Sequence, residues 1–411
     1  MKYTLNFPEH KLESSIKLPS SKSISNRLLI IKAFNDFPIE GLSDCDDTQA
    51  MQKALKSSDD TIDVGAAGTT MRFVTAYFAA TAQAKTITGS AEMKNRPVGD
   101  LVDALNHLGA DIVYLEKKGC PPIRTSGKQL SGNSIEINGN VSSQFISALL
   151  LVAPTLPDGL TIRIKGEPVS LPYIKMTLQL MKQAGVNSTF SKNVITVARQ
   201  AYRSTSELKG ICVERDMSAA SYWYQIAALA NDAEIFLEGI NKNSLQGDAA
   251  ISQIAYAFGI NTEYTPEGAL LTKVRNPCRL LWLDFLDIPD LVQTMVVTCC
   301  LTDIHFRFTG VQTLRVKETD RIAALRNEIM KLGYYIKETE PGVIEWNGER
   351  TASLRNINIS TYNDHRMAMA FSPAAILFPG LVIKDPNVVN KSYPNFWNDL
   401  KKIGAEIVIS D

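Results

Sequence analysis

The stretch that decides the fold is LVDALNHLGADIVYL, residues 101–115. Its apolar residues recur at helical spacing as far as Leu108, Gly109 follows, and a short strand pattern comes next. The same order of helix, glycine and β-branched or aromatic strand recurs four more times. The further copies are TLQLMKQAGVNSTF (177–190), ISQIAYAFGINTEY (251–264), AALRNEIMKLGYYIKE (323–338) and FWNDLKKIGAEIVI (396–409).

The five glycines of these copies are almost evenly spaced. They are Gly109, Gly185, Gly259, Gly333 and Gly404, separated by 76, 74, 74 and 71 residues. Each is expected just past a helix C-terminus, where glycine adopts the left-handed conformation most easily. A unit of about 75 residues is too long for a solenoid repeat and long enough for a small α/β unit with several strands. We expect a degenerate sixth copy near ALKSSDDTIDV, residues 54–64.

The composition is that of a globular protein with enough chain for two or three cores. The 411 residues are 45% hydrophobic and carry 43 basic and 43 acidic side chains. A net charge of zero argues against a protein that coats nucleic acid or a membrane surface, because those partners demand a basic excess. Six scattered cysteines and four histidines show no metal-ligand spacing, so we expect reduced thiols and no metal.

Neither the N-terminal sequence nor the longest uncharged run indicates export or a membrane span. The start, MKYTLNFPEH, lacks the basic and apolar regions of a signal peptide. The run from Met367 to Ile383 contains Pro373, Pro379 and Gly380, which predicts a buried helix followed by a strand. We therefore expect a cytoplasmic protein.

Six short polar turns lead directly into apolar helical patterns. They begin the stretches SSKSISNRLLIIKAF, GAAGTTMRFVTAYFAA, NVSSQFISALLLVA, RDMSAASYWYQIAALA, DIPDLVQTMVVTCC and NDHRMAMAF. Serine and aspartate at these places are good helix N-caps, which is the simpler interpretation. Exposed N–H groups and the positive end of the helix dipole would also make each turn a potential anion site.

Basic side chains beside these turns favour the anion-site interpretation. They are Lys22, Arg27, Arg72, Arg96, Lys317, Arg321, Arg366 and Lys391. Arginine binds carboxylate and phosphate groups bidentately and lysine binds them as a point charge, so the set fits polyanionic ligands. Asp290 and Glu318 lie among these cations, either as ion-pair partners or as proton-transfer groups. No Walker or dinucleotide-binding motif is present, so no nucleotide cofactor is indicated.

Nine motifs, in order along residues 18–396, closely resemble the EPSP synthase family (3-phosphoshikimate 1-carboxyvinyltransferases). They are LPSSKSISNR, GAAGTTMR, NRPVGDLVDAL, SSQFISALL, VSLPY, DIPD, LRVKETDR, NDHRMAM and KSYPNF. The resemblance implies an inside-out α/β barrel fold of two similar domains, each of three repeated α/β units with pseudo-threefold symmetry, and an active site in the interdomain cleft. The implied domains are residues 19–215, and residues 1–18 together with 216–411.

The resemblance also implies two sets of substrate-binding residues. For shikimate 3-phosphate they are Ser23, Arg27, Ser142, Ser143, Gln144, Ser170, Tyr173, Asp290, Thr313 and Lys317. For phosphoenolpyruvate they are Lys22, Gly68, Arg96, Gln144, Arg321, Arg366 and Lys391. Gln144 is expected to contact both ligands. Because Gly68 has no side chain, sensitivity to glyphosate is compatible with this site.

The implied reaction is an addition followed by an elimination, without metal or cofactor. The 5-hydroxyl of shikimate 3-phosphate adds to phosphoenolpyruvate as the methylene carbon is protonated, and the tetrahedral intermediate then loses phosphate. Lys22, Asp290 and Glu318 are the candidate catalytic residues, with His365 either assisting or only packing. Ala66 and Thr313 stand where this family more often has asparagine, which removes two potential ligand-contacting amides.

Two alternative functions make different demands on these residues. UDP-N-acetylglucosamine enolpyruvyl transferases resemble this fold and use the same donor, but they carry a cysteine before their Arg-Pro motif. The corresponding stretch here, GSAEMKNRP (89–97), has none. A catalytically inactive anion-binding homologue would be indicated by loss of Lys22, Asp290 or Glu318, and all three are present. We expect a monomer whose partners are the two small-molecule substrates.

Overall fold

The computed structural model describes residues 1–8, 11–274 and 277–410, and the chain divides into two compact units. The continuous unit is Ser20–Val213. The split unit combines Met1–Pro19 with Glu214–Asp411. The described residues form five four-stranded sheets and one two-stranded sheet, which confirms the predicted α/β class of repeated units.

Each four-stranded sheet follows one connectivity. Two parallel strands are joined by a helix in all but one sheet, and a second helix follows. Two antiparallel strands complete the sheet, as a hairpin in four sheets and as strands from opposite ends of the chain in the fifth. The continuous unit contains two complete repeats. The first is β4 (Thr61–Asp63), α3 (Gly68–Ala80), β5 (Thr86–Thr88), η1 (Met93–Asn95), α4 (Gly99–His107), β6 (Ile112–Tyr114) and β7 (Ile123–Thr125). The second is β8 (Ser134–Asn138), α5 (Ser143–Val152), η2 (Ala153–Thr155), β9 (Leu160–Lys165), α6 (Leu171–Gln183), β10 (Thr189–Ser191) and β11 (Val194–Val197).

The remaining repeat of the continuous unit is truncated. It consists of α1 (Lys22–Phe34), β3 (Ile39–Glu40), α2 (Asp46–Lys56) and β12 (Ile211–Cys212), with β12 and β3 paired in parallel. The predicted sixth copy at residues 54–64 is therefore only partly right. Its helical part ends α2, whereas its strand part is β4, which begins the next sheet instead of closing a hairpin.

The split unit contains three complete repeats. The first is β2 (Lys11–Lys17), α7 (Met217–Leu229), β13 (Asp232–Glu238), η3 (Gly247–Ala250), α8 (Ile251–Ile254), η4 (Ala255–Phe258), β14 (Ile260–Thr265) and β15 (Gly268–Lys273). The second is β16 (Leu280–Asp284), η5 (Pro289–Leu291), α9 (Val292–Leu301), β17 (His305–Thr309), η6 (Gln312–Val316), α10 (Arg321–Lys331), β18 (Lys337–Glu340) and β19 (Val343–Trp346). The third is β20 (Asn358–Ile359), α11 (His365–Phe371), η7 (Ser372–Ile376), β21 (Leu381–Lys384), η8 (Pro386–Lys391), α12 (Phe396–Lys402), β22 (Glu406–Ser410) and β1 (Lys2–Asn6).

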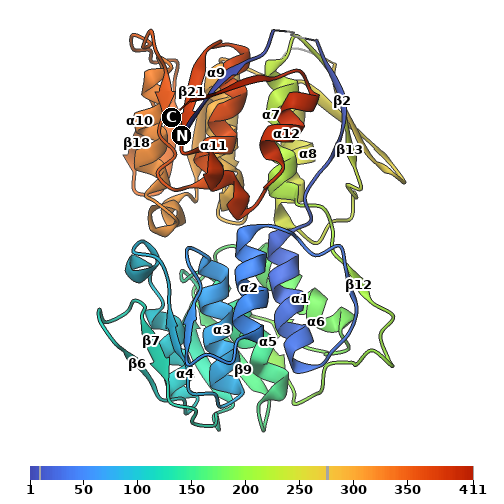
Figure 1. Cartoon of the computed structure of the whole chain (residues 1–411), viewed down its shortest axis with the longest axis vertical. Coiled ribbons are helices and arrows are strands. Elements are labelled where there is room, and N and C mark those ends of the chain that lie inside the picture. The colour runs from blue at the N-terminus through green and yellow to red at the C-terminus, as the bar shows by residue number, and fades with distance from the viewer. Residues whose placement is uncertain (9–10, 275–276, 411) are drawn as a thin grey trace. The chain divides into compact units, whose positions relative to one another are not determined.

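The N-terminal residues complete two sheets of the split unit. β1 lies between β21 and β22 and is antiparallel to both, and β2 pairs in parallel with β13. The two marked ends of the chain consequently lie side by side (Figure 1). The described part of the run from Met367 to Ile383 is a buried helix followed by a strand, as the sequence predicts, and no helix in the described chain is long and apolar enough to cross a membrane.

All five glycines of the repeated phrase end their helices in the predicted left-handed conformation. Their φ angles are 102°, 89°, 78°, 92° and 93° in chain order. The helices that the six polar turns begin are α1, α3, α5, α7, α9 and α11, and each is largely buried. Within the continuous unit, α1, α3 and α5 contact one another, and within the split unit α9 contacts both α7 and α11 (Figure 1).

Candidate active site

Arg321 is the centre of a charged cluster in the split unit. Its side chain is 2% exposed and begins α10, behind the N-cap residue Asp320. The Nε atom donates to Asp364 Oδ2 at 2.7 Å, and Nη2 donates to Glu318 Oε2 at 2.9 Å. Burial alone would lower the pKa of this guanidinium, but the charges of Asp364 and Glu318 outweigh burial and raise the pKa above its ordinary value. Arg321 is therefore a permanent buried cation.

Arg366 forms a second part of this cluster. Its Nη2 lies 2.8 Å from Asp290 Oδ2, and its Nη1 donates to the Asp290 carbonyl at 3.2 Å. Asp290 also lies 3.4 Å from Arg321 Nη1. Asp364, the N-cap of α11, accepts from the backbone N–H of Arg366. The cap therefore fixes the start of the helix that carries Arg366, while the carboxylate of Asp290 fixes the guanidinium.

Glu318 and Lys391 complete the cluster. Lys391 Nζ lies 3.3 Å from Glu318 Oε1, while the other carboxylate oxygen of Glu318 contacts Arg321. The structure thus brings five predicted residues together, Asp290, Glu318, Arg321, Arg366 and Lys391, and adds Asp364, whose side chain is fully buried. Three cations pair with three carboxylates, so an anion that binds a cation of this cluster must displace a carboxylate from it.

Three further predicted residues of the split unit lie near the ends of the same elements. Thr313 is in η6, and its buried Oγ1 has no hydrogen-bond partner among the described residues. Lys317 follows η6 directly and is half-buried. His365 is 1% exposed, with Nδ1 3.6 Å from Asp364 Oδ1. It therefore packs beside the carboxylate that holds Arg321.

In the continuous unit, Lys22 begins α1 and is oriented by a carboxylate. Its Nζ lies 3.2 Å from Asp47 Oδ2, and both side chains are mostly buried. Thr70 Oγ1 on α3 donates to the Asp47 backbone carbonyl at 3.1 Å, which ties α2 to α3. An ammonium held in this way keeps a defined position without being enclosed completely.

Arg27 is buried between α1, α5 and α6. Its guanidinium donates to Thr177 Oγ1 at 2.7 Å, to the Ser23 carbonyl at 2.9 Å and to Ser147 Oγ at 3.1 Å. The carbonyl of Tyr173 accepts a longer bond of 3.5 Å, and the rings of Tyr173 and Phe73 lie near the guanidinium. Burial lowers the pKa of Arg27 to about 10, so it remains a cation at neutral pH.

Gly68 and Arg96 are in direct apposition. A Cβ atom on Gly68 would lie 2.5 Å from Arg96 Nη1 and 2.9 Å from Arg72 Nη1. Arg72 donates to the carbonyls of Gly68 and Pro97. Among the residues that the structure describes, no side chain caps α3, which begins at Gly68. In contrast, serine or aspartate caps the N-terminal N–H groups of α1, α5, α7 and α11. Two guanidinium groups thus lie beside a helix start that lacks a side-chain cap.

The remaining predicted residues begin α1, α5 and α6. Ser142 caps α5, and Gln144 Nε2 donates to Thr69 Oγ1, next to Gly68, at 3.3 Å. Ser143 is buried, and Ser23 is half-buried in the first turn of α1. Ser170 precedes α6 in a left-handed conformation with φ 55°, two residues before the Pro172–Tyr173 turn. The predicted residues consequently form two sets, one within each unit.

Sequence reasoning missed three acidic residues that lie beside these groups. Asp47 and Asp364 hold Lys22 and Arg321, and Asp248 lies next to Ser218 beside Arg366. Asp364 could have been found, because an aspartate directly before an apolar helix is a capping signal. The stretches that contain Asp47 and Asp248 carry no comparable signal.

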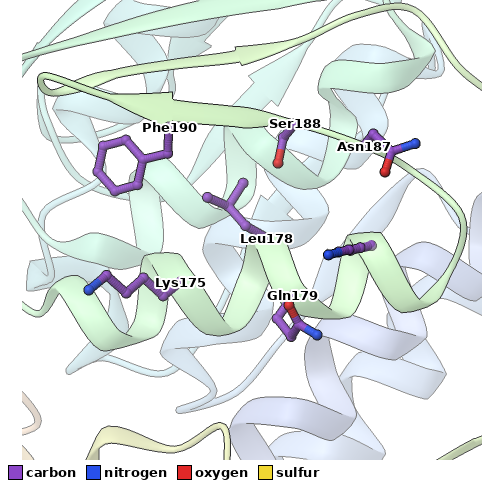
Figure 2. A pocket seen from close by; sticks show the side chains of 7 residues that line it. Lys175, Leu178, Gln179, Asn187, Ser188 and Phe190 are labelled. Carbon is purple, nitrogen blue, oxygen red and sulfur yellow. The ribbon is translucent and has the colours of Figure 1, made fainter.

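A separate groove lies on the surface of the continuous unit, between α6 and β10 (Figure 2). It has a volume of about 370 Å³ and is lined by Lys175, Leu178, Gln179, Lys182, Asn187, Ser188 and Phe190. None of the predicted site residues lines it. Among the described residues no group of His, Cys, Asp or Glu is arranged to hold a metal ion.

Comparison with known proteins adds a family. The sequence profile of "EPSP synthase (3-phosphoshikimate 1-carboxyvinyltransferase)" matches residues 54–400. Two Bacteroides fragilis proteins named 3-phosphoshikimate 1-carboxyvinyltransferase are each 49% identical to this chain, with all of both chains covered. A Shewanella pealeana protein of the same name is 35% identical over 96% of this chain and 98% of its own.

Solved structures are similar across the whole chain. An EPSP synthase structure from Acinetobacter baumannii superimposes with a TM-score of 0.74 at 20% sequence identity, covering 99% of this chain and 100% of that one. A second structure of EPSP synthase from that organism gives 0.73 at 19% identity. At this identity the likeness shows the fold.

Proposed function

The chain belongs to the EPSP synthase family, and from this premise we propose that it transfers the enolpyruvyl group of phosphoenolpyruvate to the 5-hydroxyl of shikimate 3-phosphate. The products are 5-enolpyruvylshikimate 3-phosphate and phosphate, in the shikimate pathway to aromatic amino acids. The observation that carries this proposal is the 49% identity over the full length of two 3-phosphoshikimate 1-carboxyvinyltransferases.

The reaction requires two proton transfers and the approach of two anions. In the addition step the 5-oxygen bonds to C2 of phosphoenolpyruvate, the hydroxyl proton leaves to a base, and an acid protonates C3. In the elimination step the C2–O bond to phosphate breaks and C3 gives up a proton, which restores the double bond. Positioned cations offset the repulsion between the substrates and stabilise charge in the transition state.

We assign the proton transfers to Lys22, Asp290 and Glu318. Asp290 and Glu318 each contact two cations and remain partly exposed, at 21% and 13% of the side chain, so a ligand can reach them. Lys22 is held by Asp47 and is 14% exposed. His365 is an assisting residue at most, because it is buried beside Asp364. Each of the three is a candidate acid or base for either step.

The binding assignments keep the two substrate sets that the resemblance implies, and these differ from the division by unit. Phosphoenolpyruvate takes Lys22, Gly68, Arg96, Gln144, Arg321, Arg366 and Lys391. Shikimate 3-phosphate takes Ser23, Arg27, Ser142, Ser143, Gln144, Ser170, Tyr173, Asp290, Thr313 and Lys317. The support is chemical, because guanidinium, ammonium and helix N–H groups all prefer carboxylates and phosphates.

The biological setting of the proposal is simple. The enzyme acts as a cytoplasmic monomer without a resident cofactor, and its two enolpyruvyl transferase domains are residues 19–215 and residues 1–18 with 216–411. The six cysteines are free thiols in the structure, which suits a reducing compartment. Light scattering coupled to size-exclusion chromatography tests the oligomeric state.

Phosphate release by the purified protein tests the function. The assay contains phosphoenolpyruvate with either shikimate 3-phosphate or UDP-N-acetylglucosamine as acceptor. We expect release with shikimate 3-phosphate alone, and its loss in the Lys22→Ala variant. A Lys175→Ala variant is the matched control, because Lys175 is an exposed lysine of the surface groove, which none of the predicted site residues lines. Release with UDP-N-acetylglucosamine, or no release from folded protein, would overturn the proposal.

A further inference from the structure

Asp248 is a buried carboxyl group that none of the assigned roles uses. It lies in η3, and the residue is 3% exposed. Its Oδ2 accepts a hydrogen bond from Ser218 Oγ. Its Oδ1 is buried and has no hydrogen-bond partner among the described residues. Such an atom is costly when the carboxyl is ionised, because the charge loses its water without full compensation.

A short series of contacts connects Asp248 to the charged cluster. Ser218 Oγ, which donates to Asp248, accepts from Arg366 Nη2 at 3.4 Å. The same Nη2 lies 2.8 Å from Asp290 Oδ2. Tyr222 Oη, one helical turn after Ser218 on α7, lies 3.4 Å from Arg366 Nη1. Asp248 is therefore linked to the Arg366 guanidinium through the hydroxyl of Ser218. Asp290 contacts the same guanidinium directly.

The surroundings of Asp248 favour its protonated form. Burial is the largest cause that raises its pKa, the charges of Asp290 and Asp216 raise it as well, and Arg366 and the Ser218 hydrogen bond lower it, so that the pKa comes to about 7. These are the charged groups that face it, from η5, the N-cap of α7, and α11. At neutral pH a large share of the molecules carries the proton and a large share does not.

The proton on Asp248 decides whether the cluster is neutral or carries an extra negative charge. Arg321, Arg366 and Lys391 balance Asp290, Glu318 and Asp364 when Asp248 is neutral. Ionised Asp248 adds a negative charge next to Arg366. An anion approaching Arg366 would then meet net repulsion, and conversely a bound anion would favour the protonated carboxyl.

We propose that Asp248 is a positioning residue for Arg366, acting through Ser218, and that it must hold a proton for Arg366 to bind an anion at full strength. The proton comes from water and resides on the carboxyl, and no bond of the substrate changes. The inference rests on the proposed function in one respect: the anion at Arg366 is phosphoenolpyruvate.

Steady-state kinetics of the whole enzyme test this inference. The substitution Asp248→Asn keeps the shape and the acceptor for Ser218 but cannot ionise. The KM for phosphoenolpyruvate is measured for both proteins from pH 6 to 9, and the wild-type value is divided by the variant value. Ionisation of the ligand affects both values equally, so it cancels in this ratio. We expect the ratio to rise by about threefold to tenfold between the two ends, because a coupling of half to one pKa unit has that size. The KM for shikimate 3-phosphate should keep a constant ratio.

Ser218→Ala separates position from charge. It removes the hydroxyl between Asp248 and Arg366, and we expect it to raise the KM for phosphoenolpyruvate at every pH while kcat changes less. Ser221→Ala is the matched control, since Ser221 is on the same helix and donates to the Ser218 carbonyl without contacting Arg366. Asp399→Asn is the control for a buried carboxyl that holds Tyr393 and Lys402 elsewhere in the split unit. Both controls should keep the wild-type pH profile.

A readout that does not need turnover separates this inference from the proposed function. Inorganic phosphate is added to wild type, Asp248→Asn and Arg366→Met, and the rise in melting temperature is followed against pH. We expect wild type to lose more of the phosphate-induced rise than Asp248→Asn as pH increases from 6 to 9, and Arg366→Met to show little rise. Catalytic inactivity of the wild type would refute the function while leaving this comparison intact.

The pH dependence of stability without ligand shows whether folding favours the protonated or the ionised form of Asp248. The pKa of Asp248 is higher in the folded state, at about 7, than its ordinary value of 3.8 in the unfolded chain. Its contribution to stability is therefore complete below pH 3.8 and is lost as the pH rises from there through about 7. Asp248→Asn should therefore gain stability relative to wild type over that interval. A constant difference in stability, or identical pH profiles of the KM for phosphoenolpyruvate, would overturn the inference.

Discussion

Arg321 in the split unit and Arg27 in the continuous unit are both buried guanidinium groups, yet their partners differ in charge. Arg321 contacts three carboxylates, Asp290, Glu318 and Asp364. Arg27 contacts hydroxyls and backbone carbonyls. The first arrangement neutralises the cation inside the protein, whereas the second holds the cation in place and leaves its charge to act on a ligand.

The difference has a structural origin. α10 and α11 both begin with aspartate caps, and Asp364 serves as cap and as counter-ion at once. α1 and α5 begin with serine caps, and the hydroxyls of Ser147 and Thr177 also bond each other. The split unit therefore pairs its buried guanidinium with carboxylates, whereas the continuous unit surrounds Arg27 with neutral oxygens.

Arg321→Met should give the largest effect on stability. The substitution leaves Asp364 fully buried without its main counter-ion, and breaking a buried pair in this way costs about 3–5 kcal/mol. Urea denaturation measures the change. The double variant Arg321→Met with Asp364→Asn should recover much of the loss, because asparagine still caps α11 and carries no charge. Failure of the second substitution to recover any stability would contradict the role given to the ion pair.

Arg27→Met should cost less, about 1–3 kcal/mol, because the oxygens it leaves behind are neutral and partly satisfy one another. The same denaturation assay measures it beside Arg321→Met. A loss for Arg27 as large as that for Arg321 would break the comparison between charged and neutral partners. The variant should also raise the KM for shikimate 3-phosphate, which tests the binding assignment separately.

Gly68→Ala should affect binding more than stability. The new Cβ would meet the guanidinium ends of Arg96 and Arg72, which must shift, so we expect the KM for phosphoenolpyruvate to rise about tenfold while stability falls by about 1 kcal/mol. Gly99→Ala is the matched control, because Gly99 also begins a helix and a Cβ there meets its nearest atom at 3.6 Å. An unchanged KM in Gly68→Ala would remove Arg96 from the proposed phosphoenolpyruvate site.

Asp303→Asn should have the smallest effect, because asparagine tolerates the left-handed backbone of this residue, at φ 59°, and only the charge is lost. Its carboxylate pairs with Arg350 at 2.7 Å, but the two side chains are 73% and 48% exposed. Exposed pairs of this kind contribute about 0.2–1 kcal/mol. This exposed pair is the reference for the two buried arginines. A loss of stability near that of Arg321→Met would mean that burial is not the reason why disturbing the cluster is costly.

Much of the fold could be predicted from local signals. The five glycines end helices in the left-handed conformation, and all six polar turns lead into helices, directly or through η5. The truncated repeat was placed only in part, because the missing hairpin leaves no phrase to recognise. The parallel strand β12 lies more than 170 residues from its partner β3 along the sequence, and pairing over such a distance is set by tertiary packing that no local pattern encodes.

The site was less predictable than the fold. Motifs identified the charged residues Asp290, Glu318, Arg321, Arg366 and Lys391, which the structure brings together. Asp47 and Asp248 escaped prediction, because their roles depend on burial next to groups from other helices. An acidic residue on a surface and one buried beside a charged cluster look alike in a sequence.

The most direct test of the account is a ³¹P NMR time course of the wild-type protein with equal amounts of phosphoenolpyruvate and shikimate 3-phosphate. We predict that the phosphoenolpyruvate signal falls, that inorganic phosphate rises by the same amount, and that the shikimate 3-phosphate signal is replaced by one new phosphomonoester. Phosphate that appears without consumption of shikimate 3-phosphate, or no change in any signal, would contradict the assignment.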